Sequence, residues 1–264
     1  MPDGKDPAVP GEMTLILSTA RTGTKFFETY LNRTCENMLC THEPRPSRRF
    51  KFLSNLLLQG KLGENKVWRV YRHARISLWS SLRGRRYVES NNLLFGCVPA
   101  LRSHIPGLKL VHIVRHPVDY AVSHLRHGFW SGLKGFTARH VPYWLEALDL
   151  RGPARDDPAE ILAARWNYVN RTISGYGGRY LLMRFEDIFK SAPEMQCASL
   201  DRLRTFLGCS DVPDELQLRM LDHKVNPSSR GRGGVRLDHS QKARIEESCS
   251  FLMERYGYRR RHSL

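Results

Sequence analysis

The sequence lacks several features that would mark particular protein classes. Its 264 residues contain no apolar run near the roughly 18–20 residues that a membrane-spanning helix needs. The six cysteines form no C-x-x-C pair and show no His/Cys spacing typical of zinc sites, and most have apolar neighbours. We therefore expect a cytoplasmic protein with small buried cysteines and no structural metal.

The beginning of the chain also lacks an apolar core. Residues 1–13 are polar and contain three prolines, which predicts a flexible lead-in rather than an export signal or a membrane anchor. The remaining residues, 14–264, show no repeat at a fixed period and no linker, and their number suits one α/β domain. We expect a single domain over that range.

Acidic residues are scarce relative to basic ones. The chain has 42 Lys and Arg against 26 Asp and Glu, which gives a formal net charge of +16. Such a charge attracts anions, whether nucleic acid, an acidic membrane surface or small polyanionic ligands.

Short apolar runs alternate with segments of helical periodicity along the chain. Strands are expected at 15–17, 36–41, 85–89, 109–115 and 180–184. Helices are expected after Gly23 and at 47–60, 64–82, 93–101, from Pro117, from Pro158 to Gly177, and at 193–207, 213–222 and 238–256, with a loop-rich excursion at 128–156. This order predicts an α/β, three-layer, P-loop-like fold, in which a central, mainly parallel sheet is flanked by helices.

The loop Ser18–Gly23 stands between the first predicted strand and the first predicted helix. The first amides of a helix have no intrahelical partner and carry partial positive charge, so this geometry favours a bound phosphate or sulfate. Gly23 permits close approach of the backbone. Charge and hydroxyl groups come from Arg21, Thr22, Thr24 and Lys25. At this point an ordinary polar turn is the alternative.

The loop does not follow the nucleoside-triphosphate pattern G-x-x-x-x-G-K-[ST]. Thr24 separates Gly23 from Lys25, and Lys25 is followed by Phe26 rather than by a residue with a magnesium-binding hydroxyl.

Three segments resemble motifs of the sulfotransferases that use 3′-phosphoadenosine 5′-phosphosulfate (PAPS). Ser-Thr-Ala-Arg-Thr-Gly-Thr, residues 18–24, resembles the 5′-phosphosulfate loop in its arginine-type spelling, which carbohydrate and bacterial members use. Val114–Ser123 looks like the 3′-phosphate motif, an R-[DN]-P segment with Ser eight residues after the Arg. Tyr180–Asp187 is similar to the family's R-[YF]-E-D strand end. The first two motifs, about 90 residues apart in an α/β frame, are more specific together than either alone.

The resemblance implies transfer of the sulfuryl group from PAPS to a hydroxyl or amine of an acceptor. Adenosine 3′,5′-bisphosphate (PAP) would be released, and no metal would be needed. Arg21 would contact the phosphosulfate and neutralise the leaving oxygen. The family's other donor contacts would fall on Thr22, Gly23, Thr24 and Lys25 for the 5′-phosphate, and on Arg115 and Ser123 for the 3′-phosphate.

The acceptor hydroxyl needs a base within hydrogen-bond reach. Glu43, followed by Pro44, resembles the Glu-Pro of some carbohydrate and bacterial sulfotransferases and is the preferred candidate. His42 and Glu89, which also follow predicted strands, are the alternatives.

A late loop, residues 228–234, reads Ser-Ser-Arg-Gly-Arg-Gly-Gly. In position and composition it resembles the R-K-G-x-x-G segment that closes over the 3′-phosphate in cytosolic sulfotransferases. The resemblance implies donor contacts from Arg230, Arg232 and Gly233. A basic loop that binds RNA without sequence preference is the alternative.

Two other functions compete with sulfuryl transfer. A P-loop small-molecule kinase using NTP is disfavoured by the missing G-K-[ST]. A basic RNA-binding protein without catalysis would need stacking aromatics on a sheet face, and the sequence shows no such pattern. We expect a polar acceptor, such as a glycan or another hydroxylated small molecule, with no specific nucleic-acid partner and no membrane. The sequence leaves the acceptor's identity and the oligomeric state open.

Overall fold

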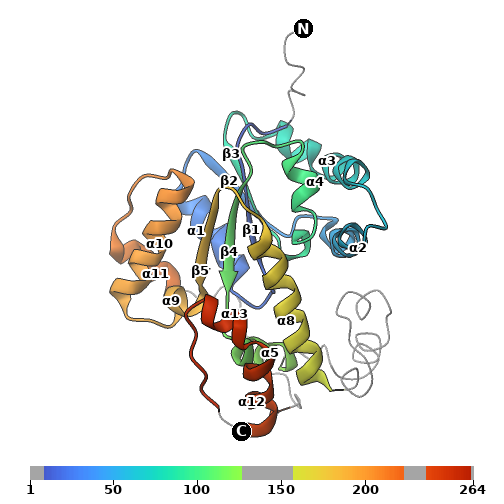
Figure 1. Cartoon of the computed structure of the whole chain (residues 1–264). Helices are drawn as coiled ribbons and strands as arrows, with labels where there is room; N and C mark the ends of the chain where they lie inside the picture. Colours follow the sequence, from blue (N-terminus) through green and yellow to red (C-terminus); the bar gives the residue numbers. More distant parts are fainter. Residues whose placement is uncertain (1–8, 127–156, 223–235, 263–264) are drawn as a thin grey trace.

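The computed structural model describes residues 9–126, 157–222 and 236–262. Within these ranges five strands form one sheet in the order β2-β3-β1-β4-β5, and every neighbouring pair is parallel. The strands are β1 (Met13–Ser18), β2 (Met38–His42), β3 (Arg86–Ser90), β4 (Lys109–Val114) and β5 (Tyr180–Arg184) (Figure 1). This arrangement confirms the predicted α/β fold with a parallel sheet flanked by helices.

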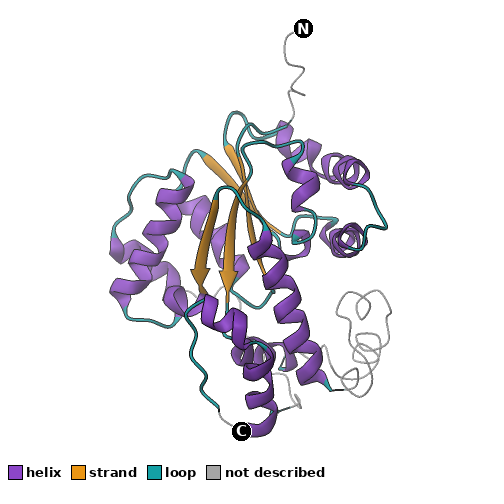
Figure 2. Cartoon of the chain, in the orientation of Figure 1, coloured by secondary structure: helices purple, strands orange, loops and turns teal. Residues whose placement is uncertain are grey.

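Helices cover both faces of the sheet (Figure 2). One face packs against α2 (Ser47–Leu58), α3 (Glu64–Ser80), α4 (Val98–Arg102) and part of α8 (Pro158–Gly175). The other packs against α1 (Thr24–Thr34), α9 (Phe185–Phe189), α10 (Pro193–Leu207) and α11 (Asp214–Asp222). Because side chains alternate along a strand, Leu15 and Leu17 of β1 join the first cluster and Ile16 joins the second.

A third apolar cluster lies beyond the carboxyl end of β4. It joins α5 (Pro117–Leu125), α12 (His239–Ser248) and α13 (Ser250–Arg255) to the remaining side of α8. Pro117 and Pro158 occupy the first helical turns, as predicted, and the Asp157 carboxylate caps α8 by accepting the Ala159 amide at 2.8 Å.

The helix predicted at 93–101 is wrong as one element. It consists of the short 3₁₀ helix η1 (Asn92–Leu94) and α4, separated by Gly96. A Cβ at Gly96 would lie 2.7 Å from the Ser54 carbonyl, so the chain turns here against the backbone of α2. The helix predicted at 238–256 is likewise divided at Cys249, and α9 was not predicted. With five residues, α9 is too short to show a helical period.

Other expectations concern the cysteines and the polar segments. All six cysteines are free, and five of them are buried. Met13, the last residue of the predicted lead-in, already belongs to β1. The predicted excursion at 128–156 and the loop 228–234 both lie entirely outside the described residues.

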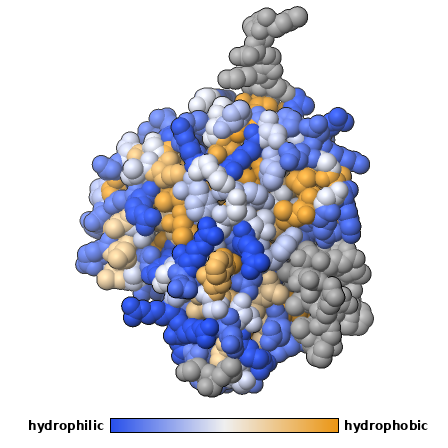
Figure 3. Space-filling view, viewed as in Figure 1, coloured by the Kyte–Doolittle hydropathy of each residue, from blue (hydrophilic) through white to orange (hydrophobic). Residues whose placement is uncertain are grey.

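The described helices do not include one with the length and apolarity that crossing a bilayer requires. The face of the molecule in Figure 3 is largely hydrophilic, and its apolar side chains gather in separate patches.

Candidate functional site

The loop between β1 and α1 curls tightly because three residues adopt left-handed backbone conformations. These are Ala20 (φ 73°), Arg21 (φ 59°) and Gly23 (φ 71°). Residues other than glycine rarely adopt such angles, and strained backbone of this kind concentrates at ligand-binding sites. The Ala20 amide donates to the Ser18 hydroxyl at 3.1 Å, which stabilises the curl. The curled loop ends at Gly23, and α1 begins at the next residue, so the loop lies beside the first-turn amides, which favour an anion.

The segments that follow β1 and β4 meet at the carboxyl edge of the sheet. Arg21 Nε donates to Ser123 Oγ at 3.3 Å, and Arg115 Nη1 donates to the Arg21 carbonyl at 2.6 Å. The two motifs that carry the resemblance, although 94 residues apart at this contact, thus form one site. Open α/β sheets bind ligands at this edge.

Arg115 is held from several sides. Its guanidinium lies 4.3 Å from the centre of the Phe185 ring, and its carbonyl accepts the Trp166 indole N–H at 2.8 Å. Burial lowers the pKa of Arg115, while Asp119 and Glu186 act in the opposite direction. Burial also lowers the pKa of Arg21. Two partly buried guanidinium groups at one edge of the sheet favour a bound anion, which would offset their desolvation.

Several buried polar atoms at the site have no hydrogen-bond partner among the described residues. They are Thr19 Oγ1, Thr22 Oγ1 and Arg115 Nε. An unsatisfied buried donor costs about 1–3 kcal/mol. These atoms fit an oxyanion. Of the other predicted contacts, Thr24 is buried and its carbonyl accepts the Ser90 hydroxyl at 2.9 Å, whereas Lys25 is exposed on the first turn of α1.

The third motif, Arg184–Asp187, joins β5 to the same edge. Arg184 and Asp187 form an ion pair at 2.7 Å, and Glu186 accepts the His116 amide at 3.1 Å. Glu186 also accepts the Tyr258 hydroxyl at 2.6 Å. The motif therefore fixes the turn that presents Arg115.

The Arg115–His116 turn also contacts Glu246 of α12 and the segment that follows α13. The Glu246 carboxylate, fully buried, lies 3.6 Å from His116 Nε2 and 2.9 Å from His262 Nδ1. It also accepts the amides of Arg261 and His262 at 2.9 and 2.8 Å. Burial opposes ionisation, but the contacts with His262 and Arg261 lower the pKa of Glu246 overall. The chain's last described residues thus support the Arg115–His116 turn.

No model of a known protein family matches the sequence, and no curated protein sequence matches it. Solved structures do match. The sulfotransferase domain from the curacin biosynthetic pathway aligns with a TM-score of 0.55 and 15% identity over 95% of this chain and 99% of that one. A sulfotransferase from Alicyclobacillus acidocaldarius gives 0.54 and 17% over 96% and 97%. Mouse sulfotransferase SULT7A1, complexed with PAP, gives 0.51 and 14% over 93% and 86%. The chain has the sulfotransferase fold.

Within the sulfotransferase fold of this chain, Glu43 and His42 lie at the end of β2. Glu43 (φ 44°) is half-buried, and its Oε1 accepts Asn92 Nδ2 at 2.8 Å. His42 Nδ1 lies 3.1 Å from the Ser90 carbonyl, and its amide donates to Glu28. Asn92 is a partner that sequence reasoning missed, although its place just after the third predicted strand was a usable signal.

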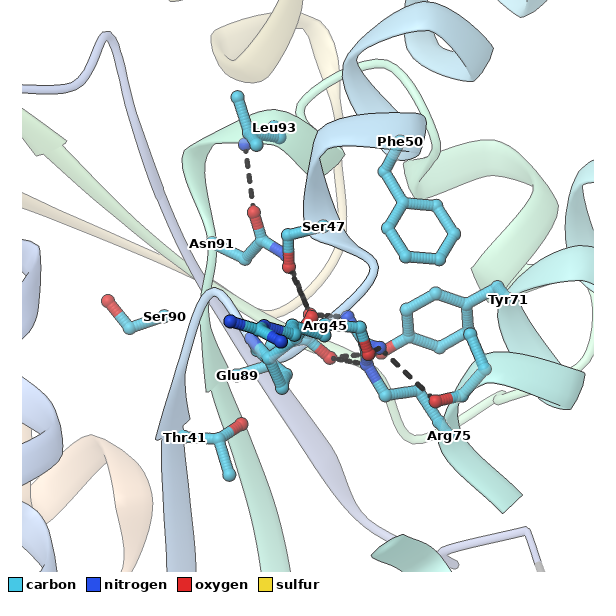
Figure 4. Close-up of polar contacts among 12 residues, drawn as sticks. Thr41, Arg45, Ser47, Phe50, Tyr71, Arg75, Glu89, Ser90, Asn91 and Leu93 are labelled. Carbon is cyan, nitrogen blue, oxygen red and sulfur yellow. Dashed lines mark hydrogen bonds and ion pairs between the residues drawn. The ribbon is translucent and has the colours of Figure 1, made fainter. Parts of the chain in front are cut away.

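Glu89 has a different environment (Figure 4). Glu89 belongs to β3, and its fully buried side chain points toward α3. There, Arg75 binds the carboxylate through two nitrogens. Donors to its carboxylate among the described residues are Arg75 Nε (2.9 Å), Arg75 Nη2 (2.8 Å), Tyr71 (2.7 Å), Tyr87 (2.9 Å) and Asn91 (2.7 Å). These donors already occupy both oxygens of the buried carboxylate. The geometry therefore favours a structural role for Glu89 and leaves Glu43 and His42 as base candidates.

The predicted donor contacts Arg230, Arg232 and Gly233 lie outside the described residues.

Arg75→Met is expected to destabilise the protein by about 3–5 kcal/mol, because it leaves the Glu89 carboxylate buried without its cation. Urea unfolding followed by circular dichroism measures the change. Arg75→Met/Glu89→Leu should recover part of the loss, since the uncompensated charge is then gone. Unchanged stability of Arg75→Met would contradict this account of the pair.

Gly23→Ala is expected to destabilise the protein by about 1–2 kcal/mol, because residue 23 has a left-handed backbone conformation that alanine adopts only at a cost. The added Cβ would also meet the Phe189 ring at 2.8 Å. Gly177→Ala is the matched control, since Gly177 is exposed, lies outside the left-handed region and has no atom within 4 Å of an added Cβ. Equal urea midpoints for the two variants would show that the loop does not need glycine.

Proposed function

We propose that this protein is a sulfotransferase that moves the sulfuryl group of PAPS to a hydroxyl or amine of an acceptor and releases PAP. The observation that carries the proposal is the junction of Arg21, Ser123 and Arg115 at the carboxyl ends of β1 and β4. It places cationic and hydroxyl donors of both motifs at one edge. A donor with a 5′-phosphosulfate and a separate 3′-phosphate needs such a pair of contacts.

The donor contacts follow from the loop and the β4–α5 turn. We assign the 5′-phosphosulfate to the loop residues Arg21, Thr22, Gly23, Thr24 and Lys25. Arg115 and Ser123 are assigned to the 3′-phosphate, where the Phe185 ring holds the guanidinium in place. The buried hydroxyl of Thr22 and the Nε of Arg115, both without a partner in the described part of the chain, support an oxyanion at each end. Arg230, Arg232 and Gly233 complete the proposed contacts.

Bound PAPS supplies a sulfuryl group activated by its bond to phosphate. Glu43 accepts the proton of the acceptor hydroxyl as the new S–O bond forms, and Asn92 holds its carboxylate in place. Arg21 neutralises the charge that develops on the phosphate oxygen as the old S–O bond breaks. Most of the catalysis then comes from positioning and charge neutralisation, as in phosphoryl transfer.

A kinase mechanism fits the loop less well. At the position after Lys25, where NTP-binding loops have a magnesium-binding hydroxyl, this chain has Phe26. The Phe26 ring is buried and stacks on Tyr30 with centroids 5.3 Å apart, so it belongs to the core.

PAP at a hundredfold excess over its Kd is expected to raise the melting temperature by about 5–10 °C, whereas ATP with magnesium should have little effect. A thermal-shift assay measures both. Arg115→Ala should abolish the PAP effect, while Arg219→Ala, at an exposed position on α11, should keep it. Stabilisation by ATP with magnesium alone would favour the kinase.

Glu43→Gln is expected to reduce sulfuryl transfer at least about 100-fold while PAP still stabilises the protein. The assay measures radiolabelled sulfate transferred from PAPS to an acceptor found in a panel of hydroxylated compounds. His42→Gln serves as the comparison. Near-normal turnover in Glu43→Gln, or a larger loss in His42→Gln, would move the base away from Glu43.

A further inference from the structure

A narrow pocket opens beside the donor loop, between α2, η1 and α8. Ser18, at the end of β1, and Thr19, in the loop that follows, line it. Asn92, which holds the Glu43 carboxylate, lines it as well. The pocket therefore touches both the proposed phosphosulfate loop and the partner of the proposed base. A group bound here would therefore lie next to the proposed sulfuryl donor and to the proposed base.

The polar side chains of this pocket favour an anion. Lys51 comes from α2 and Arg165 from α8, and the amides of Asn55 and Asn92 lie beside them. None of the described residues that line the pocket is acidic. Guanidinium and ammonium groups with neighbouring amides are the donors that bind carboxylates in proteins.

The pocket's size and aromatic wall limit what it can take. Its cavity volume is about 20 Å³, little more than the space of one water molecule. Phe95 and Tyr168, whose ring centres are 5.9 Å apart at a steep angle, form the apolar wall. This volume admits only a small group such as a carboxylate, with the body of the ligand outside the pocket.

The protonation of Lys51 depends on the groups around it. Burial and the charge of Arg165 lower the pKa of Lys51 to about 5, while Glu43 acts in the opposite direction. An anion in the pocket would stabilise the ammonium form. Binding of an anion at pH 7 would therefore be accompanied by protonation of Lys51.

We propose that this pocket binds the acceptor through a carboxylate, held by Lys51 and Arg165, so that the protein sulfates hydroxylated acids in preference to their neutral counterparts. The inference rests on the proposed function and names the substrate class of that site. The carboxylate fixes the acceptor, and its hydroxyl is then presented between Glu43 and the donor loop.

The test measures binding by calorimetry at pH 7 in the presence of saturating PAP. Two matched pairs are compared: 4-hydroxyphenylacetate with its amide, and phenyl β-glucuronide with phenyl β-glucoside. At least one acid should bind about tenfold or more tightly than its neutral partner. Lys51→Met and Arg165→Met should each remove this preference but keep the PAP-induced thermal shift, which shows that the variants fold. The exposed residues Lys66 and Arg219, each changed to Met, are the controls.

A second measurement detects the proton uptake that accompanies binding. Binding of the preferred acid to the unaltered protein should show an enthalpy that depends on the buffer's ionisation enthalpy, as proton uptake requires, and Lys51→Met should remove that dependence.

Three outcomes overturn the proposal. In the first, neither acid is preferred although PAP binds. In the second, the preference survives in both Lys51→Met and Arg165→Met. In the third, inorganic sulfate binds in a Lys51-dependent way and both acids fail, which would assign the pocket to the donor's sulfuryl group. Failure of PAP itself to bind would instead contradict the proposed function.

Discussion

The parallel pairing of β1 with β4 is the constraint on which the candidate site depends. Their register sets Ser18 opposite Ile113, so both strands end at the same edge and the residues that follow them meet. A register change of two residues would displace Arg115 by about 7 Å and separate it from the Arg21 carbonyl. The core residues that hold this register, such as Leu15 and Val111, are therefore as necessary to the site as the arginines are.

The carboxylates around Arg115 have structural partners of their own. Asp119 and Glu186 partly oppose the lowering of the Arg115 pKa by burial. Asp119, however, pairs with Lys190 at 2.8 Å, and Glu186 accepts hydrogen bonds from the His116 amide and the Tyr258 hydroxyl. Lys190 therefore balances part of the Asp119 charge, while Glu186 acts mainly by positioning the turn that carries Arg115.

The sequence was most informative where local chemistry determines structure. Proline at the first turns of α5 and α8 and the alternation of strands with helices predicted the fold, and the Arg21 and Arg115 motifs predicted which strand ends would meet. Local patterns could not identify the partners of Glu89. A glutamate at a strand end resembles a catalytic base, and only tertiary packing brings Arg75 and Tyr71 onto its oxygens. The Lys51–Arg165 pocket was hidden for the same reason, since α2 and α8 are distant in sequence.

The contact between His116 and the Arg259 carbonyl, at 3.4 Å, spans 143 residues of sequence. During synthesis, the turn that carries Arg115 emerges from the ribosome long before Glu246 and His262 are made. All five strands precede Glu246 and His262 in the sequence. The residues that support the Arg115–His116 turn are therefore synthesised after all five strands, so on a nascent chain the sheet can form before this edge of it is complete.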